Sequence, residues 1–155
     1  MKIKITGVYV DDQDKALRFY TDVLGFVKKT DFGAGGYRWL TVVSPEEPDG
    51  TELHLETNAD PAAKTFQQAL FQQGKPAAMF YVDDVQREYE RIQALGAQFT
   101  MPPTKVTGST IAVLNVVDVE HDGRFALLKQ GLLERLRGRI CVQLQVQLDP
   151  VWLLG

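Results

Sequence analysis

The chain has 155 residues, a mass of 17.4 kDa and a net charge of −3, which suits one domain or two small halves that share a core. Its 45% hydrophobic and 24% charged residues exclude a disordered chain, and the slightly acidic balance gives no electrostatic reason to expect a nucleic acid or an anionic membrane as partner. No apolar run approaches the about 20 residues that span a bilayer, and the single cysteine, Cys141, excludes an internal disulfide, so we expect a cytoplasmic protein.

The chain opens with MKIKITGVYV, whose alternation of polar and apolar residues predicts a strand rather than a signal peptide. This stretch leads into the tetrapeptide YVDD at residues 9–12, which returns at residues 81–84. The match continues through the next segment, because Gly25 and Gly96 lie at nearly the same offset as the two tetrapeptides. One deletion inside the second helix accounts for the small difference. The simplest explanation is an internal duplication.

Each copy predicts the order strand, acidic pair, amphipathic helix, Leu-Gly and three further strands. In the first copy the helix covers residues 13–24, and the later strands cover 26–32, 37–44 and 51–57. In the second copy the helix covers 85–95, and the later strands cover 97–103, 109–118 and 124–130. A short helix is expected between the copies at 62–73. The fold class is therefore α+β, with two tandem βαβββ modules.

These elements predict four parts of the chain. The parts are a first module (1–58), a linker with the short helix (59–75), a second module (76–130) and a C-terminal extension (131–155).

An aspartate of each YVDD can cap the helix that follows, since a carboxylate accepts hydrogen bonds from the free N–H groups of the first turn. Capping is the commoner use of aspartate at such a turn, with catalysis as the alternative. Gly25 and Gly96 suit the left-handed backbone conformation that commonly ends a helix.

The duplicated βαβββ pattern, with YVDDQDKALRFYTDVLGF, RWLTV and LGAQF, resembles the vicinal oxygen chelate superfamily. That superfamily contains glyoxalase I, bleomycin-resistance proteins and extradiol dioxygenases, and the resemblance covers about residues 1–130. It implies that the sheets form an incomplete barrel around a cavity, often completed in a homodimer.

In metal-dependent members of the superfamily, four strand positions supply ligands, and the resemblance places them at Ile5, His54, Ala77 and Leu127. Isoleucine, alanine and leucine have no lone pair to donate, and a single histidine cannot hold a catalytic ion. The sequence therefore predicts no metal and no other cofactor.

Glu52, His54 and Glu56 alternate along one predicted strand, so their side chains share one face. Neighbours on that face lie roughly 6–7 Å apart, which is too wide for all three to share one ion easily. Binding of an adventitious metal stays open for this group, and solvated edge residues are the ordinary reading of the two glutamates.

Strand alternation and the resemblance together indicate which side chains line the cavity. Aromatic walls suit a flat or amphipathic organic ligand, with ordinary core packing as the alternative for each residue. Tyr37 is a further aromatic residue on these strands. The residues expected to contact a ligand are Tyr9, Trp39, Glu52, His54, Glu56, Met79, Tyr81 and Phe125.

The catalytic residues are unknown, and His54 and Glu56 are the only candidates. His54 can line the pocket, act as a general acid or base, or serve a structural role beside its glutamate neighbours.

In the C-terminal extension, the segment ICVQLQVQL alternates apolar residues with glutamine, which predicts a strand. It can pair with an edge of the same barrel or with a second subunit, or the extension can be irrelevant to function. Edge pairing is the favoured reading.

The sequence thus favours a metal-independent cytoplasmic homodimer that binds a small organic molecule, as bleomycin-resistance proteins do. One alternative is a metal-dependent lyase or dioxygenase of the same superfamily with a non-standard ligand set. Another is a non-catalytic sensing module with a vestigial pocket.

Overall fold

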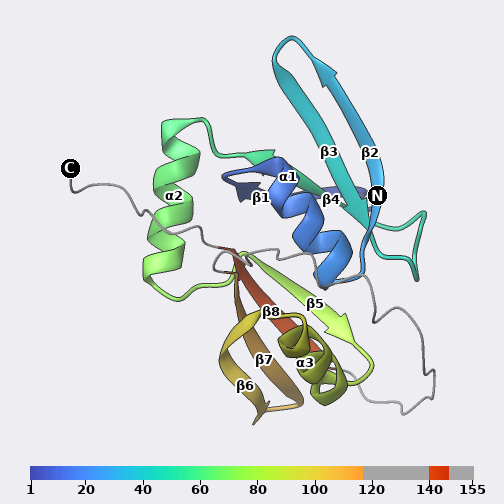
Figure 1. Ribbon diagram of the computed structural model, residues 1–155, viewed down its shortest axis with the longest axis vertical. Helices are drawn as coiled ribbons and strands as arrows, with labels where there is room; N and C mark the ends of the chain where they lie inside the picture. The colour runs from blue at the N-terminus through green and yellow to red at the C-terminus, as the bar shows by residue number, and fades with distance from the viewer. Residues whose placement is uncertain (117–139, 147–155) are drawn as a thin grey trace. The chain divides into compact units, whose positions relative to one another are not determined.

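The structure is a computed structural model that describes residues 1–116 and 140–146 (Figure 1). The chain divides into two compact units, of which the first comprises residues 1–73 and the second begins at Gly74. Each unit contains one four-stranded sheet, and each follows the order β-α-β-β-β, which confirms the predicted α+β class. Both sheets are open.

The first unit begins with β1 (Ile5–Val10), α1 (Gln13–Arg18) and the π-helical turn η1 (Phe19–Val23). It continues with β2 (Val27–Ala34), β3 (Tyr37–Val43), β4 (Glu52–Thr57) and α2 (Pro61–Gln72). The strand order is β1-β4-β3-β2, with β1 parallel to β4 and the other pairs antiparallel. Figure 1 shows β2 and β3 as a long hairpin that projects past β1 and β4.

The core of this unit lies between the sheet and the segment α1–η1. The pairings of Val8 with Leu55 and of Val42 with Leu53 place these apolar side chains on one face of the sheet. All four are buried there. The helical segment contributes a second group of buried side chains, namely Ala16, Phe19, Tyr20 and Val23. Alternation along the strands thus sends every second residue into the core.

The two aspartates that follow the repeated Tyr-Val differ in role, and the capping prediction is confirmed for the second of each pair. Asp12 accepts hydrogen bonds from the backbone N–H groups of Asp14 (2.8 Å) and Lys15 (2.9 Å). Asp84 accepts one from Arg87 N–H (3.1 Å). The predicted helix over 13–24 is only partly α-helical, because Leu24 N–H bonds to Phe19 O (3.1 Å) in the wider π pattern.

The glycine prediction at the helix ends is also confirmed. Gly25 and Gly96 have φ angles of 83° and 85°, which lie in the left-handed region that glycine adopts without a Cβ penalty.

The second unit contains β5 (Ala78–Val82), α3 (Val85–Ala94), β6 (Gln98–Val106), β7 (Ser109–Val116) and β8 (Ile140–Val146). Its strand order is β5-β8-β7-β6. Val85 of α3 and Ala112 of β7 form a buried apolar cluster with the partly buried Val82, Tyr89 and Phe99.

The fourth strand of this sheet is β8, which comes from the predicted C-terminal extension and not from the second module. The strand predicted at 124–130 lies outside the described residues, and β8 occupies the place between β5 and β7. The strand prediction for ICVQLQVQL is therefore confirmed, but its expected place at an edge is wrong, because β8 has a neighbour on both sides. It runs parallel to β7, whereas β4 runs antiparallel to β3. Residues 117–139 separate β7 from β8, and a parallel pair needs such a long connection.

Candidate functional site

The candidate site lies on the face of the first sheet opposite to α1. Thr41 pairs with His54 across β3 and β4, and Gly7 pairs with His54 across β1 and β4. Because paired residues project to the same side, the alternate residues of these strands share that face. We call it the polar–aromatic face and define it by Tyr9, Tyr37, Trp39, Thr41, Glu52, His54 and Glu56.

His54 lies at the centre of this face and is only 5% exposed. Its imidazole ring stacks on the indole of Trp39, with ring centroids 4.2 Å apart and planes inclined by 20°. Its Nδ1 atom lies 3.0 Å from Glu56 Oε2, and its Nε2 atom lies 3.3 Å from the hydroxyl of Tyr37. Tyr37 in turn donates a hydrogen bond to Glu56 Oε2 (2.9 Å). Both ring nitrogens of His54 therefore already have partners within the protein.

The hydroxyl groups of β3 hold the carboxylates of β4. Thr41, which is fully buried, donates from Oγ1 to Glu52 Oε2 (2.7 Å), and Tyr37 serves Glu56 in the same way. Partial burial raises the pKa of Tyr37, and the hydrogen bond to Glu56 and the charge of that carboxylate act in the same direction. The phenol thus stays protonated and able to donate.

The residues predicted to contact a ligand divide into three groups. Tyr9, Trp39, Glu52, His54 and Glu56 come together on the polar–aromatic face, where Tyr9 is 40% exposed. Met79 and Tyr81 belong to the second unit and are exposed at alternate positions of β5. Phe125 lies outside the described residues.

Tyr37 belongs to the polar–aromatic face, but the predicted ligand set omits it. It is 40% exposed and joins His54 to Glu56 through its hydroxyl. The available signal was its position two residues before Trp39, which places both aromatic rings on one face of a strand.

The positions that the resemblance assigns to metal ligands do not form a set of metal-binding side chains here. Ile5 is an exposed apolar residue of β1, Ala77 precedes β5, and Leu127 lies outside the described residues. Within residues 1–116 and 140–146, no three His, Cys, Asp or Glu side chains are grouped so that they could hold an ion. Because three of the four expected positions carry apolar side chains without a lone pair to donate, this set of residues does not fit a catalytic divalent cation.

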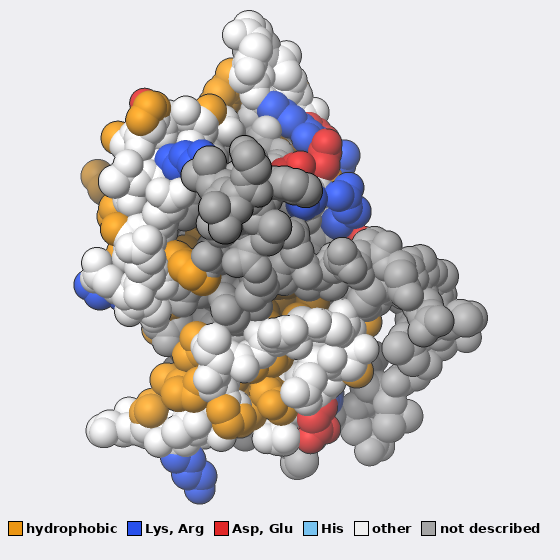
Figure 2. All heavy atoms as spheres, turned by 60° about the vertical axis from the view of Figure 1, so that its left-hand side comes forward, with side chains coloured by type: hydrophobic (Ala, Val, Ile, Leu, Met, Phe, Trp, Pro, Cys, Tyr) orange, Lys and Arg blue, Asp and Glu red, His pale blue; other side chains and the backbone are white. Residues whose placement is uncertain are grey.

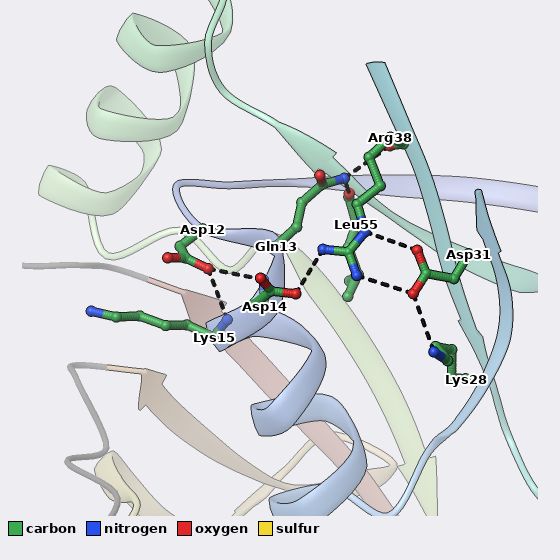
Figure 3. Close-up of polar contacts among 8 residues, drawn as sticks. All are labelled: Asp12, Gln13, Asp14, Lys15, Lys28, Asp31, Arg38 and Leu55. Carbon is green, nitrogen blue, oxygen red and sulfur yellow. Dashed lines mark hydrogen bonds and ion pairs between the residues drawn. The ribbon is translucent and has the colours of Figure 1, made fainter. Parts of the chain in front are cut away.

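A second polar network lies on the other face of the first sheet, beside α1 (Figure 3). Arg38 contacts Asp31 through Nε (2.8 Å) and Nη2 (3.0 Å) and contacts Asp14 through Nη1 (2.7 Å). Hydrogen bonds from Arg38 and Lys28 hold the pKa of Asp31 well below its usual range. Gln13 adds hydrogen bonds from Nε2 to the carbonyls of Arg38 (3.0 Å) and Leu55 (2.7 Å). This network anchors the start of α1 to the sheet.

Large hydrophobic side chains also reach the surface elsewhere. Phe32, Phe66, Met79 and Tyr81 are each more than half exposed, and Figure 2 shows hydrophobic side chains at several places on the face that it presents. Among the helices that the structure describes, none is long and apolar enough to cross a membrane.

An open sheet with a helix on one face and polar and aromatic side chains on the other, in a chain with two βαβββ units, defines a tandem α+β fold. Residues 2–123 match the model of the Glyoxalase/Bleomycin resistance protein/Dioxygenase superfamily, and the chain belongs to that superfamily. The resemblance inferred from the repeated sequence is thereby confirmed.

The chain is also similar to individual bacterial proteins. The chain is 53% identical over 115 residues to the uncharacterized protein YurT of Bacillus subtilis (strain 168), a match that covers 74% of this chain and 91% of YurT. It is 33% identical over 111 residues to an uncharacterized protein of Shewanella frigidimarina (strain NCIMB 400), covering 69% of this chain and 79% of that protein.

Among solved structures, UcmS2 is similar with a TM-score of 0.65 and 28% identity, covering 74% of this chain and 90% of UcmS2. TnmS3, an antibiotic binding protein from Streptomyces sp. CB03234, has a TM-score of 0.60 and 21% identity, covering 94% of this chain and 96% of TnmS3. At that identity the likeness to TnmS3 concerns the fold alone.

Proposed function

We propose that this protein binds a small, flat organic molecule on the polar–aromatic face of its first sheet, without a metal ion, as a cytoplasmic homodimer. The main observation behind this proposal is the stacked pair Trp39–His54, which shares its face with the partly exposed rings of Tyr9 and Tyr37. Aromatic walls with a few fixed polar groups are typical of sites that bind small organic molecules. Met79, Tyr81 and Phe125 remain proposed ligand contacts.

The residues at the expected ligand positions support binding rather than metal-assisted chemistry. His54 is the only one of these positions that carries a lone-pair donor, because Ile5, Ala77 and Leu127 are apolar. The contacts of His54 with Glu56, with Tyr37 and with the ring of Trp39 explain its place on the face without a metal. The antibiotic-binding relative TnmS3 shares the fold, so ligand sequestration is a function that this architecture supports.

Ligand binding is tested by a thermal-shift screen against aromatic compounds and antibiotics. A ligand present at 100 times its Kd should stabilise the protein by about 2.7 kcal/mol. Trp39→Leu should abolish that shift, whereas Phe66→Leu, at an exposed position on α2, should leave it unchanged. The proposal fails if no compound stabilises the wild-type protein, or if the Trp39 variant responds as the wild type does.

Metal independence has its own test in elemental analysis of the purified protein. We expect zinc, nickel, manganese and iron below stoichiometric amounts. A stoichiometric metal that is lost in His54→Ala would show that a non-standard ligand set exists and that the protein resembles the metal-dependent members.

A further inference from the structure

We propose that the ligand of the polar–aromatic face is an organic cation, in which a flat ring carries a protonated amine, amidine or guanidinium group. This inference rests on the proposed function and specifies its ligand class. Three observations support it: the negative charges on the face, the carboxylate oxygens that accept no hydrogen bond from described residues, and the aromatic rings between the two carboxylates.

The charge balance of the face is negative. Glu52 and Glu56 both project from it, and no Lys or Arg of the described chain forms an ion pair with either carboxylate. The basic residues of the neighbouring strands are engaged elsewhere. Arg38 binds Asp31 and Asp14 on the opposite face, and Lys29 bonds to the carbonyl of Pro48 (2.7 Å).

His54 is the remaining group on this face that can carry a positive charge. Its Nδ1 contact is with Glu56, so one imidazole at most offsets one of two carboxylates. A cationic ligand would therefore complement the charge of the face, whereas an anionic ligand would meet partly desolvated carboxylates of like charge.

The hydrogen bonds within the face fix each carboxylate through one oxygen. Both contacts of Glu56 with described residues, from Tyr37 and from His54, are made by Oε2. The contact of Glu52 with Thr41 is also made by Oε2. An ionised carboxylate offers about four acceptor sites over its two oxygens. The Oε1 atoms are thus the acceptors that a ligand N–H group would use.

The two carboxylates flank an aromatic platform. Glu52 and Glu56 lie four residues apart on β4, which corresponds to roughly 13 Å along a strand. His54 lies midway between them and stacks on Trp39. Tyr9 and Tyr37 present further partly exposed rings, and cations are attracted to the faces of such rings. A flat ring with a cationic substituent matches both features at once.

The test compares two indoles of similar length and opposite charge, tryptamine and indole-3-propionate, by calorimetric titration of the full chain. We expect tryptamine to bind about tenfold more tightly than indole-3-propionate, as charge-assisted hydrogen bonds predict. Glu52→Gln and Glu56→Gln keep an oxygen for Thr41 and Tyr37 but remove the charge. Each should weaken tryptamine binding about five- to tenfold. Glu46→Gln, at an exposed position between β3 and β4, is the matched control and should have no effect.

Equal or tighter binding of indole-3-propionate, or tryptamine binding that neither glutamine variant weakens, would overturn the inference. If neither indole binds, the hits of the thermal-shift screen decide. Cationic hits that Glu56→Gln weakens support the inference, and neutral or anionic hits that depend on Trp39 refute it while the proposed function stands. A screen without any hit refutes both.

Discussion

At the start of α1 and of α3, the second aspartate of the repeated acidic pair accepts hydrogen bonds from backbone N–H groups of the first helical turn. Asp12→Ala and Asp84→Ala should therefore each lower the free energy of unfolding by about 1 kcal/mol, as for helix caps in general. Urea unfolding followed by circular dichroism measures this loss. Asp83→Ala is the matched control, because Asp83 is exposed and does not cap α3. A loss at Asp83 equal to that at Asp84 would contradict the capping role.

The contacts of Asp31 with Arg38 and Lys28 predict that the stability of the folded protein depends on pH. Because these hydrogen bonds lower the pKa of Asp31 in the folded state, their stabilisation is fully present above the unfolded value of about 3.9. It is lost as the pH falls below that value toward the folded pKa. Asp31→Asn should thus destabilise the protein at pH 7, and the difference from the wild type should shrink below about pH 4.

Urea titrations between pH 3 and pH 7 measure that difference. Asp49→Asn is the control, since Asp49 forms a far more exposed contact with Lys29 at 3.4 Å, and such contacts contribute little. A constant difference between wild type and Asp31→Asn across this range would mean that Asp31 is not held by charge.

Alternation was sufficient to place Glu52, His54 and Glu56 on one face, because a strand has a fixed period of two. The stacking of Trp39 on His54 and the hydroxyl of Tyr37 between His54 and Glu56 were not predictable in the same way. Both depend on the register between β3 and β4, which is set by packing between segments distant in the sequence. The Arg38–Asp31 network depends in turn on the register of the β2–β3 hairpin.

At the scale of elements, local sequence signals were sufficient to identify the helices and most of the strands. Apolar periodicity, capping aspartates and glycines at helix ends act within a few residues of the element that they define. The place of β8 could not be obtained from such signals, because alternation in ICVQLQVQL identifies a strand but not its neighbours. Nothing local distinguishes an edge position from one between β5 and β7.

The central position of β8 predicts its importance for the second unit. Val142→Pro removes a backbone donor and should open the pairing of β8 with β5 and β7, since proline is not tolerated inside a sheet. We expect hydrogen exchange to show lost amide protection in β5 and β7 and unchanged protection in β1 and β4. Val142→Ala keeps the backbone donor and serves as the control. Unchanged protection of β5 in the proline variant would show that β8 is not needed there.

At the scale of the whole molecule, each unit leaves part of its sheet incomplete. In the described sheets β1 and β5 each have a strand on one side only, and both carry exposed apolar side chains, namely Ile5, Tyr9, Met79 and Tyr81. Unpaired strand edges and exposed apolar surface are features that proteins commonly cover by association. They support the proposed homodimer.

Light scattering coupled to size exclusion tests this proposal at micromolar protein concentration. The expected mass is twice the 17.4 kDa of the chain, because a closed two-fold assembly is the commonest way for identical chains to cover the same surface. Tyr81→Lys places a charge on the exposed face of β5 and should shift the mass toward the monomer if that strand takes part. Phe66→Lys is the matched control on α2. A mass near 17.4 kDa for the wild type would rule out a stable dimer at that concentration, and ligand binding would then have to be complete within one chain.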